Sequence, residues 1–168
     1  MKLPIPRCLI HWFGALLFFA WVPVCQAQTQ SALGPWLILE RNSNEQPEIV
    51  SVIRDLPSKD IQQRFPVLLE IMWGYEALPN GLPTERDLIL ARKLYAALDS
   101  LVGEQGIHAL TRTGGGGRTM YYYVKEAGAL NKGIRTFFDA YPPISVKVVA
   151  GKDPAWQRVR EMLSAIKR

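Results

Sequence analysis

The sequence predicts an α+β domain with a ferredoxin-like (βαββαβ) core, an N-terminal β-hairpin and a C-terminal helix. From Pro66 to Ala150, apolar residues alternate between the two-residue period of strands and the longer period of helices, in the order strand, helix, strand, strand, helix, strand. Residues 1–27 have the basic start, apolar stretch and small-residue exit of an export signal. Both cysteines lie in this leader, so packing without disulfides would hold the exported chain together.

The leader has the three parts of a signal peptide. Lys2 and Arg7 form the basic start, and the stretch Trp12–Val22 is an uninterrupted apolar run. Small residues precede position 28, and signal peptidases cut after such residues. We therefore expect cleavage between Ala27 and Gln28, and an exported bacterial protein that is periplasmic or secreted.

Two other interpretations of the leader stay open. An uncleaved membrane anchor would run over residues 8–24, which is shorter than the roughly 20 residues that cross the hydrocarbon and includes a histidine and a proline. A lipoprotein would be acylated at Cys25, but Val24 stands where a small residue is usual. Cleavage would leave a chain with no membrane segment.

The composition excludes several functional classes. The full chain has 20 basic and 15 acidic residues, and cleavage would remove two basic residues, leaving 18 against 15. This small excess is spread along the chain, so it does not predict nucleic acid or anionic lipid as a partner. Loss of Cys8 and Cys25 with the leader would exclude cysteine nucleophiles and thiolate metal sites. We expect no cofactor.

The remaining chain divides into a short tether and one domain. Residues 28–34 are polar and small, which is typical of a flexible tether, and residues 35–168 have the length of a single domain. Trp36–Arg41 and Glu48–Arg54 are β-rich and flank turn-forming residues, which predicts an N-terminal hairpin. Leu56–Arg64 is then a connector with room for one helical turn.

The next segment predicts a buried strand and a capped helix. Val67–Trp73 is apolar on both faces apart from Glu70, as in a buried strand. Asn80-Gly81 forms a turn, and Thr84 followed by acidic residues suits a helix N-cap. The helix would run to Val102, on an apolar stripe of Leu90, Leu94, Ala97 and Leu101, widened by Ala91, Leu98 and Val102.

The second half of the core predicts a hairpin and another helix. Ile107–Thr113 and Arg118–Val124 are β-rich, and the four glycines at 114–117 between them allow the turn of an antiparallel pair. A four-three-four spacing then predicts a helix that Pro142-Pro143 ends. The residues of its apolar stripe are Leu130, Ile134, Phe137 and Tyr141.

The C-terminal part predicts a fourth core strand and a last helix. Ile144–Ala150 is the strand, and Asp153 as N-cap with Pro154 at the first helical position would begin the helix. Its apolar stripe is Trp156, Val159, Leu163 and Ile166. Both core helices would cover one sheet face, and the hairpin and last helix would extend the sheet or cap its open side.

Several landmarks occur in a characteristic order: an early Trp36, the turn and cap Asn80–Thr84, Arg118 before Tyr121–Tyr123, and Asp153–Trp156. With these, the chain resembles a bacterial family known only as domain of unknown function 695. The resemblance covers most of the chain after the leader. It implies a fold, and it implies no activity, cofactor or catalytic residue.

Aromatic side chains are the main candidates for binding. Tyr121 and Tyr123 project to one face of their strand, and Trp73 and Tyr75 share a parity on another strand. With Arg118, which follows the glycine run, they are our surface candidates for binding a protein partner or a second copy of the chain. In the other interpretation, the N-terminal hairpin or a second subunit covers these rings as core.

Catalytic candidates are few, and we predict a binding module with no catalytic residue. His108 is the only histidine after the leader, and a histidine in a strand is typically a half-buried sheet residue. Glu70 would face solvent or pair with an arginine such as Arg112. The alternative function is a small-ligand enzyme or hydrolase that uses Glu70 or His108, and a polar, concave cluster around either residue would favour it. The glycine run before Arg118 is predicted to be a hairpin loop and not an anion site, because a strand follows where a phosphate loop has a helix.

Overall fold

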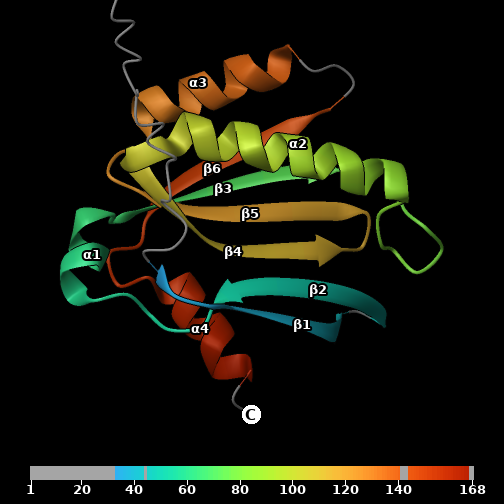
Figure 1. Ribbon diagram of the computed structural model, residues 1–168, viewed down its shortest axis with the longest axis horizontal. Helices are drawn as coiled ribbons and strands as arrows, with labels where there is room; N and C mark the ends of the chain where they lie inside the picture. The colour runs from blue at the N-terminus through green and yellow to red at the C-terminus, as the bar shows by residue number, and fades with distance from the viewer. Residues whose placement is uncertain (1–32, 44, 141–143, 167–168) are drawn as a thin grey trace, which may run out of the picture.

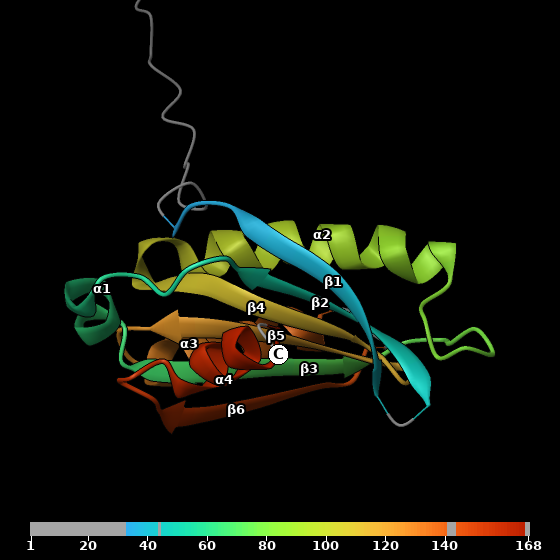
Figure 2. The same cartoon turned by 90° about the horizontal axis from the view of Figure 1, so that it is seen from below.

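A six-stranded antiparallel sheet is the centre of the computed structural model, which describes residues 33–43, 45–140 and 144–166. Its strand order is β1-β2-β4-β5-β3-β6. Figures 1 and 2 show α2 and α3 on one face of this sheet and α4 on the other. The predicted α+β class is confirmed. The sheet has two strands more than the expected four-stranded core, because the N-terminal hairpin pairs with the edge at β4.

The predicted strands and helices are present, with small shifts at their ends. The strands are β1 Trp36–Ser43, β2 Gln46–Ile53, β3 Val67–Gly74, β4 Gly106–Gly114, β5 Gly117–Val124 and β6 Val146–Lys152. The helices are α1 Lys59–Arg64, α2 Glu85–Val102, the short 3-10 helix η2 Gly103–Gln105, α3 Gly128–Asp139 and α4 Gln157–Ile166. The leader, its cleavage site, most of the tether and the Tyr141–Pro143 stop lie outside the described residues.

Helix α2 begins and ends where local chemistry predicts. The Thr84 hydroxyl accepts a hydrogen bond from the Asp87 backbone N–H at 3.3 Å, and Gly103 has the positive φ of 45° that favours glycine after a helix. The face that packs on the sheet consists of Ala91, Leu94, Leu98 and Val102. Leu101 is 40% exposed, so the buried stripe is rotated from the one that the sequence predicts.

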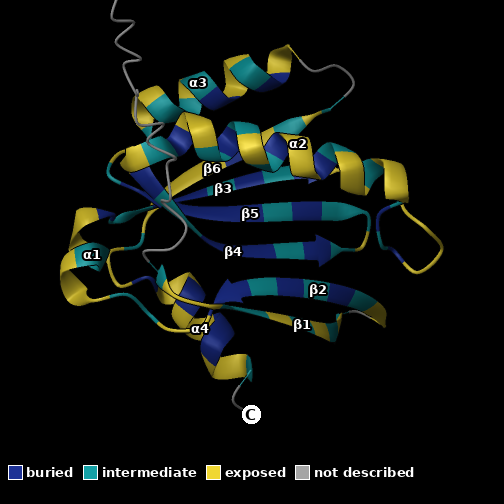
Figure 3. Ribbon diagram, in the orientation of Figure 1, coloured by how far each residue is buried: buried dark blue, intermediate teal, exposed yellow. Residues whose placement is uncertain are grey.

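Alternation along the strands divides the interior into two layers. Leu69, Ile71 and Tyr122 pack beneath α2 and α3, whereas Tyr121 and Tyr123 pack with α4 on the opposite face. Figure 3 shows this burial along the central strands, and it shows β1 as a largely exposed or partly exposed edge. Both faces of β5 are therefore covered, whereas α2 and α3 do not cover β1.

Helix α4 begins later than the sequence predicts. Trp156 has a φ of 53°, in the left-handed region, so the helix starts at Gln157 and not at Pro154. The Asp153 carboxylate still caps it, accepting hydrogen bonds from the backbone N–H groups of Gln157 at 2.7 Å and Arg158 at 3.1 Å. Asp153 therefore caps α4 from a position one turn before the first residue of the helix.

The turn at Trp156 places its indole under the sheet. The ring is fully buried, stacks on Tyr123 with centroids 3.9 Å apart, and donates a hydrogen bond to the Phe65 carbonyl at 3.1 Å. The Tyr123 hydroxyl donates to Asp153 at 2.6 Å. Tyr121 and Tyr123 are therefore core, as the second interpretation predicted, and both the N-terminal hairpin and α4 pack over them.

Candidate functional site

Four of the five residues expected on the surface lie in the interior. Trp73, Arg118, Tyr121 and Tyr123 are 6%, 8%, 3% and 0% exposed, and Tyr75 is partly exposed. The surface placement of those four is wrong because helices cover both faces of the central strands. The structure does not bring the five together, since Trp73 packs under α2 and α3 while Tyr121 and Tyr123 pack with α4.

Hydrogen bonds join the glycine turn between β4 and β5 to the loop that precedes α2. The Tyr75 hydroxyl donates to the Gly81 carbonyl at 2.9 Å, and the Gly116 N–H donates to that same carbonyl at 3.0 Å. Arg118 turns inward, where it donates to the Thr113 hydroxyl at 2.9 Å and lies 5.4 Å from the centre of the Tyr95 ring. These contacts give the glycines and Arg118 a packing role.

Glu70 pairs with an arginine, as one interpretation predicted, but that arginine is Arg158 and not Arg112. Glu70 lies 3.6 Å from Arg158 of α4, whereas Arg112 pairs with Glu48 at 2.7 Å. Glu48 is 7% exposed and also accepts from Arg41 at 2.5 Å, so it bridges two cations across β1, β2 and β4. Such a buried carboxylate is stable because both partners hydrogen bond to it.

A β-bulge in β4 places two polar side chains on one face. The register shifts between His108, which is opposite Tyr122, and Leu110, which is opposite Tyr121. In a regular strand, residues three apart project to opposite faces. The extra residue in β4 instead puts both His108 and Thr111 on the face of α2, with the His108 Nε2 and the Thr111 Oγ1 2.8 Å apart.

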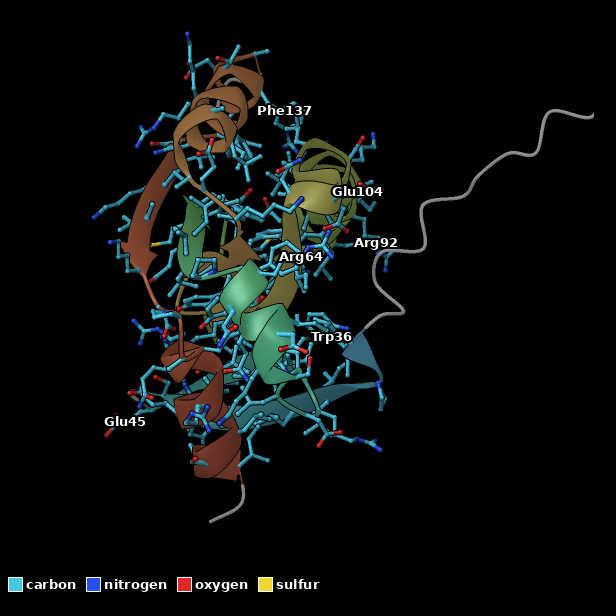
Figure 4. The ribbon with its side chains drawn as sticks, turned by 90° about the vertical axis from the view of Figure 1, so that its left-hand side faces the viewer. Trp36, Glu45, Arg64, Arg92, Glu104 and Phe137 are labelled. Atoms are coloured by element: carbon cyan, nitrogen blue, oxygen red, sulfur yellow. The ribbon has the colours of Figure 1, made fainter. Side chains whose placement is uncertain are left out.

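A hollow of about 260 Å³ lies above these two residues, and we call it the His108 hollow. Its lining comes from β1, β2, β4 and α2: Trp36, Ile38, Ser51, Tyr95, Asp99, His108 and Thr111. Figure 4, viewed from the left-hand side of Figure 1, places Trp36 on β1 below Arg92 of α2 and Glu104 of η2. The hollow is thus the space between α2 and the added hairpin.

Sheet register explains why the hollow forms there. Ile38, Ser51 and Thr111 stand opposite one another on β1, β2 and β4, and the row continues to Met120 on β5. Helix α2 packs over Met120, which is fully buried. At the other end of the row, Ile38 is 76% exposed, so the covering layer ends between these two residues.

Three aromatic rings surround His108: Trp36 and Tyr95 from the lining of the hollow, and Tyr122, which is buried beside it. The His108 ring stacks on Tyr122, with centroids 4.7 Å apart and planes 23° from parallel. Trp36 and Tyr95 lie at centroid distances of 5.0 and 6.0 Å from His108, both tilted to it. Rings at these separations contact one another directly, so each limits the movement of the next.

Polar groups in the lining and directly beside it have shifted pKa values. Burial raises the pKa of the Asp99 carboxyl, and the hydrogen bond that Tyr122 donates to it at 2.8 Å partly opposes this rise. Burial also raises the pKa of the Tyr95 hydroxyl, and it raises that of Tyr122 further. Burial lowers the pKa of His108 to about 4, with a hydrogen bond to the Leu110 backbone opposing the change. His108 is therefore neutral at pH 7.

Sequence reasoning singled out His108 but none of its partners in the hollow. Asp99 stands four residues after Tyr95 on α2, which puts both on one flank of that helix. Ser51 was a usable signal too, because it is the polar residue within the apolar run Ile49–Ile53. No feature of the sequence indicated the β-bulge in β4.

Comparisons with protein families, curated proteins and solved structures give no match. Within residues 33–43, 45–140 and 144–166, no three His, Cys, Asp or Glu side chains are grouped so that they could hold a metal ion. The helices of the described part of the chain are too short or too polar to cross a membrane. The chemistry of the His108 hollow is therefore the main guide to function.

Proposed function

We propose that this chain is an exported protein that binds a small molecule in the His108 hollow and does not catalyse a reaction. The observation that carries the proposal is a hollow of about 260 Å³ whose lining combines the apolar surfaces of Trp36, Ile38 and Tyr95 with four polar residues. Small-molecule sites in proteins typically combine an apolar, aromatic lining with a few placed polar groups. The proposal narrows the expected binding module to a ligand site.

Preorganisation supports binding. Trp36, Tyr95 and Tyr122 each contact His108, and they lie on β1, α2 and β5, respectively. His108 itself lies on β4. A ligand that enters would lose its own freedom but would not need to order these rings. Sites that are already formed bind more tightly because this ordering cost is absent.

The polar groups support binding over catalysis. His108 contacts Thr111, and Tyr122 donates to Asp99, so these groups already have partners in the wall. The pKa of His108 is about 4, far below the pH at which a general base works best. Glu70, the other candidate, lies on the opposite sheet face beside Arg158.

The export and fold parts of the proposal have separate support. Export is supported by the leader pattern, with a cut between Ala27 and Gln28. A ferredoxin-like core from β3 to β6 is supported by the element order β3-α2-β4-β5-α3-β6 and by the order β4-β5-β3-β6 among those strands. Membership of family 695 is supported by the landmarks that resemble it.

A hollow-filling variant tests the proposal. Ser51→Leu would place an apolar side chain in the hollow, and Ser164→Leu makes the same change on the exposed side of α4. A library of small neutral and charged compounds is screened against the full chain by thermal shift and calorimetry. We expect ligands that bind the wild type and Ser164→Leu but not Ser51→Leu. Equal binding to all three proteins, or no binding at all, would contradict the proposal.

One contact favours a second candidate function, a hydrolase. The His108 Nε2 lies 2.8 Å from the Thr111 hydroxyl, which is the geometry of a hydroxyl nucleophile beside its base. In that case the wild type would hydrolyse p-nitrophenyl acetate, and Thr111→Val would abolish the reaction while keeping the fold. Labelling of Thr111 by a fluorophosphonate, read by mass spectrometry, would replace our proposal with this one.

A further inference from the structure

Strand β1 leaves one edge of the sheet open. It stands at the end of the strand order opposite β6, and no described strand pairs with its outer side. Figure 1 shows β1 and β6 at opposite ends of the sheet. An open edge carries unpaired backbone N–H and C=O groups that can pair with a strand from another chain. The outer side of β1 is therefore a surface to which a further strand can bind.

The two edge strands of the sheet differ in how they are protected from such pairing. Lysines on an edge strand discourage it, and β6 has the exposed Lys147 and Lys152. The first half of β1, Trp36–Leu39, has no charged residue. Within this half, Ile38 is 76% exposed, more than any other large hydrophobic residue in the described part of the chain. The outer edge of β1 therefore lacks the protection that β6 has.

Pairing within the hairpin decides which backbone groups of β1 point outward. The Arg54 N–H donates to the Pro35 carbonyl at 2.9 Å, and these two residues continue the register of β1 with β2. In an antiparallel pair, residues that hydrogen bond to the neighbouring strand alternate with residues whose backbone groups point away from it. Four residues of β1 therefore have N–H and C=O groups that point outward: Trp36, Ile38, Glu40 and Asn42.

We infer that β1 pairs with β1 of a second copy of this chain, in an antiparallel, two-fold symmetric dimer centred on Ile38. In this register each Ile38 stands opposite its counterpart, and Leu37 stands opposite Leu39, so the apolar half of one strand meets the apolar half of the other. A register centred on Glu40 would place two like charges opposite each other, which is destabilising. A register centred on Leu39 would place Ile38 opposite Glu40, without an apolar partner.

This dimer would also continue the row of side chains at the His108 hollow. Met120, Thr111, Ser51 and Ile38 form that row, and α2 packs over its inner end at Met120. Pairing at Ile38, which lines the hollow, would extend the row into the second copy. The second copy would then cover the outer end of each hollow. The inference concerns the edge of β1, and it does not depend on a ligand.

A substitution on the two-fold axis tests the dimer. Ile38→Lys would place two cations opposite each other, and Val149→Lys makes a matched change at an exposed residue of the other edge strand, β6. By sedimentation velocity, we expect a concentration-dependent dimer for the wild type and Val149→Lys. The dissociation constant of Ile38→Lys should be at least roughly tenfold higher. Both side chains are exposed, so the thermal midpoints of the variants should stay close to that of the wild type.

Single cysteines test the register. Opposite residues that hydrogen bond across antiparallel strands have Cα atoms about 5.5 Å apart, a separation that suits a disulfide. Under mild oxidation, Ile38→Cys should therefore form a covalent dimer. Glu40 would stand opposite Trp36 and far from its own counterpart, so Glu40→Cys should form much less. The wild type measures any linkage through Cys8 and Cys25 of the leader.

Three results would overturn the inference. The first is a wild type that stays monomeric up to about 1 mM. The second is a dimer that Ile38→Lys leaves unchanged, because the contact would then lie elsewhere, the leader included. The third is cross-linking of Glu40→Cys as efficient as that of Ile38→Cys. These measurements use no ligand, so their failure would leave the proposed small-molecule site in place.

Discussion

Protonation of His108 should destabilise the folded protein. In the structure its ring is stacked on Tyr122 and contacted by Trp36 and Tyr95, and burial lowers its pKa from 6.5 to about 4. A histidine in the unfolded chain takes up a proton near pH 6.5, so between pH 6.5 and 4 the unfolded state binds more protons than the folded state. Stability that is present at neutral pH is then lost as the pH falls through this range.

The size of the effect follows from the shift. A difference of 2.5 pH units corresponds to about 3 kcal/mol once the pH is below 4, because each unit is worth about 1.4 kcal/mol. Between pH 7.5 and 5 the loss is about 2 kcal/mol. Small domains are stable by roughly 5–15 kcal/mol, so this loss is measurable.

Urea unfolding of the wild type and His108→Gln at both pH values isolates the effect. Other groups titrate in both proteins, and the difference between them removes that shared contribution. We expect the wild type to lose about 2 kcal/mol more than the variant between pH 7.5 and 5. Imidazole resonances that disappear in the variant identify His108 in NMR spectra, and they should titrate near pH 4. Equal losses in the two proteins, or a titration at pH 6 or above, would refute the reasoning.

Two further predictions concern the far sheet face and the leader. Trp156→Ala removes a fully buried ring that stacks on Tyr123 and bonds to the Phe65 carbonyl, so it should cost roughly 3–5 kcal/mol in urea unfolding, and an unchanged midpoint would contradict this packing. Intact mass spectrometry of the exported protein should find Gln28 as the first residue, whereas an intact Met1 in the membrane fraction would support the uncleaved anchor.

Local signals predicted the elements well. Thr84 marks the start of α2 because its hydroxyl caps a backbone N–H of the first turn, a contact between residues three apart. The apolar run Val67–Trp73 indicates a strand covered on both faces, and β3 is one. Signals of this kind act over a few residues, so the sequence displays them directly.

Predictions that needed longer contacts were less successful. Trp156 was expected in the first turn of the last helix, but its indole binds beneath the sheet and the backbone turns left-handed to allow this. Arg112 pairs with Glu48 and not with Glu70, because β2, and not β3, is its neighbour on that side. Strand order decided this pairing, and alternation along a strand says nothing about strand order.

The candidate site shows the same division. Sequence alone singled out His108 as the one histidine after the leader. Composition argued against cysteine chemistry and against a basic surface for nucleic acid. Its partners in the hollow depended on the bulge in β4 and on how far α2 reaches across the sheet. The apolar pattern of β4 is the same whether or not the strand bulges at Ala109, so only the pairing of β4 with β5 reveals the bulge.

By itself, the sequence determined the α+β class and the order of the elements, because helix caps, turns and apolar periods are properties of neighbouring residues. The tertiary structure decided that Tyr121 and Tyr123 are core and that the polar, aromatic hollow lies at His108. Trp36, Tyr95 and His108 are separated by many residues, and they meet only because the added hairpin extends the sheet beyond α2. Where one layer ends over another depends on how whole elements pack, and no local pattern encodes it.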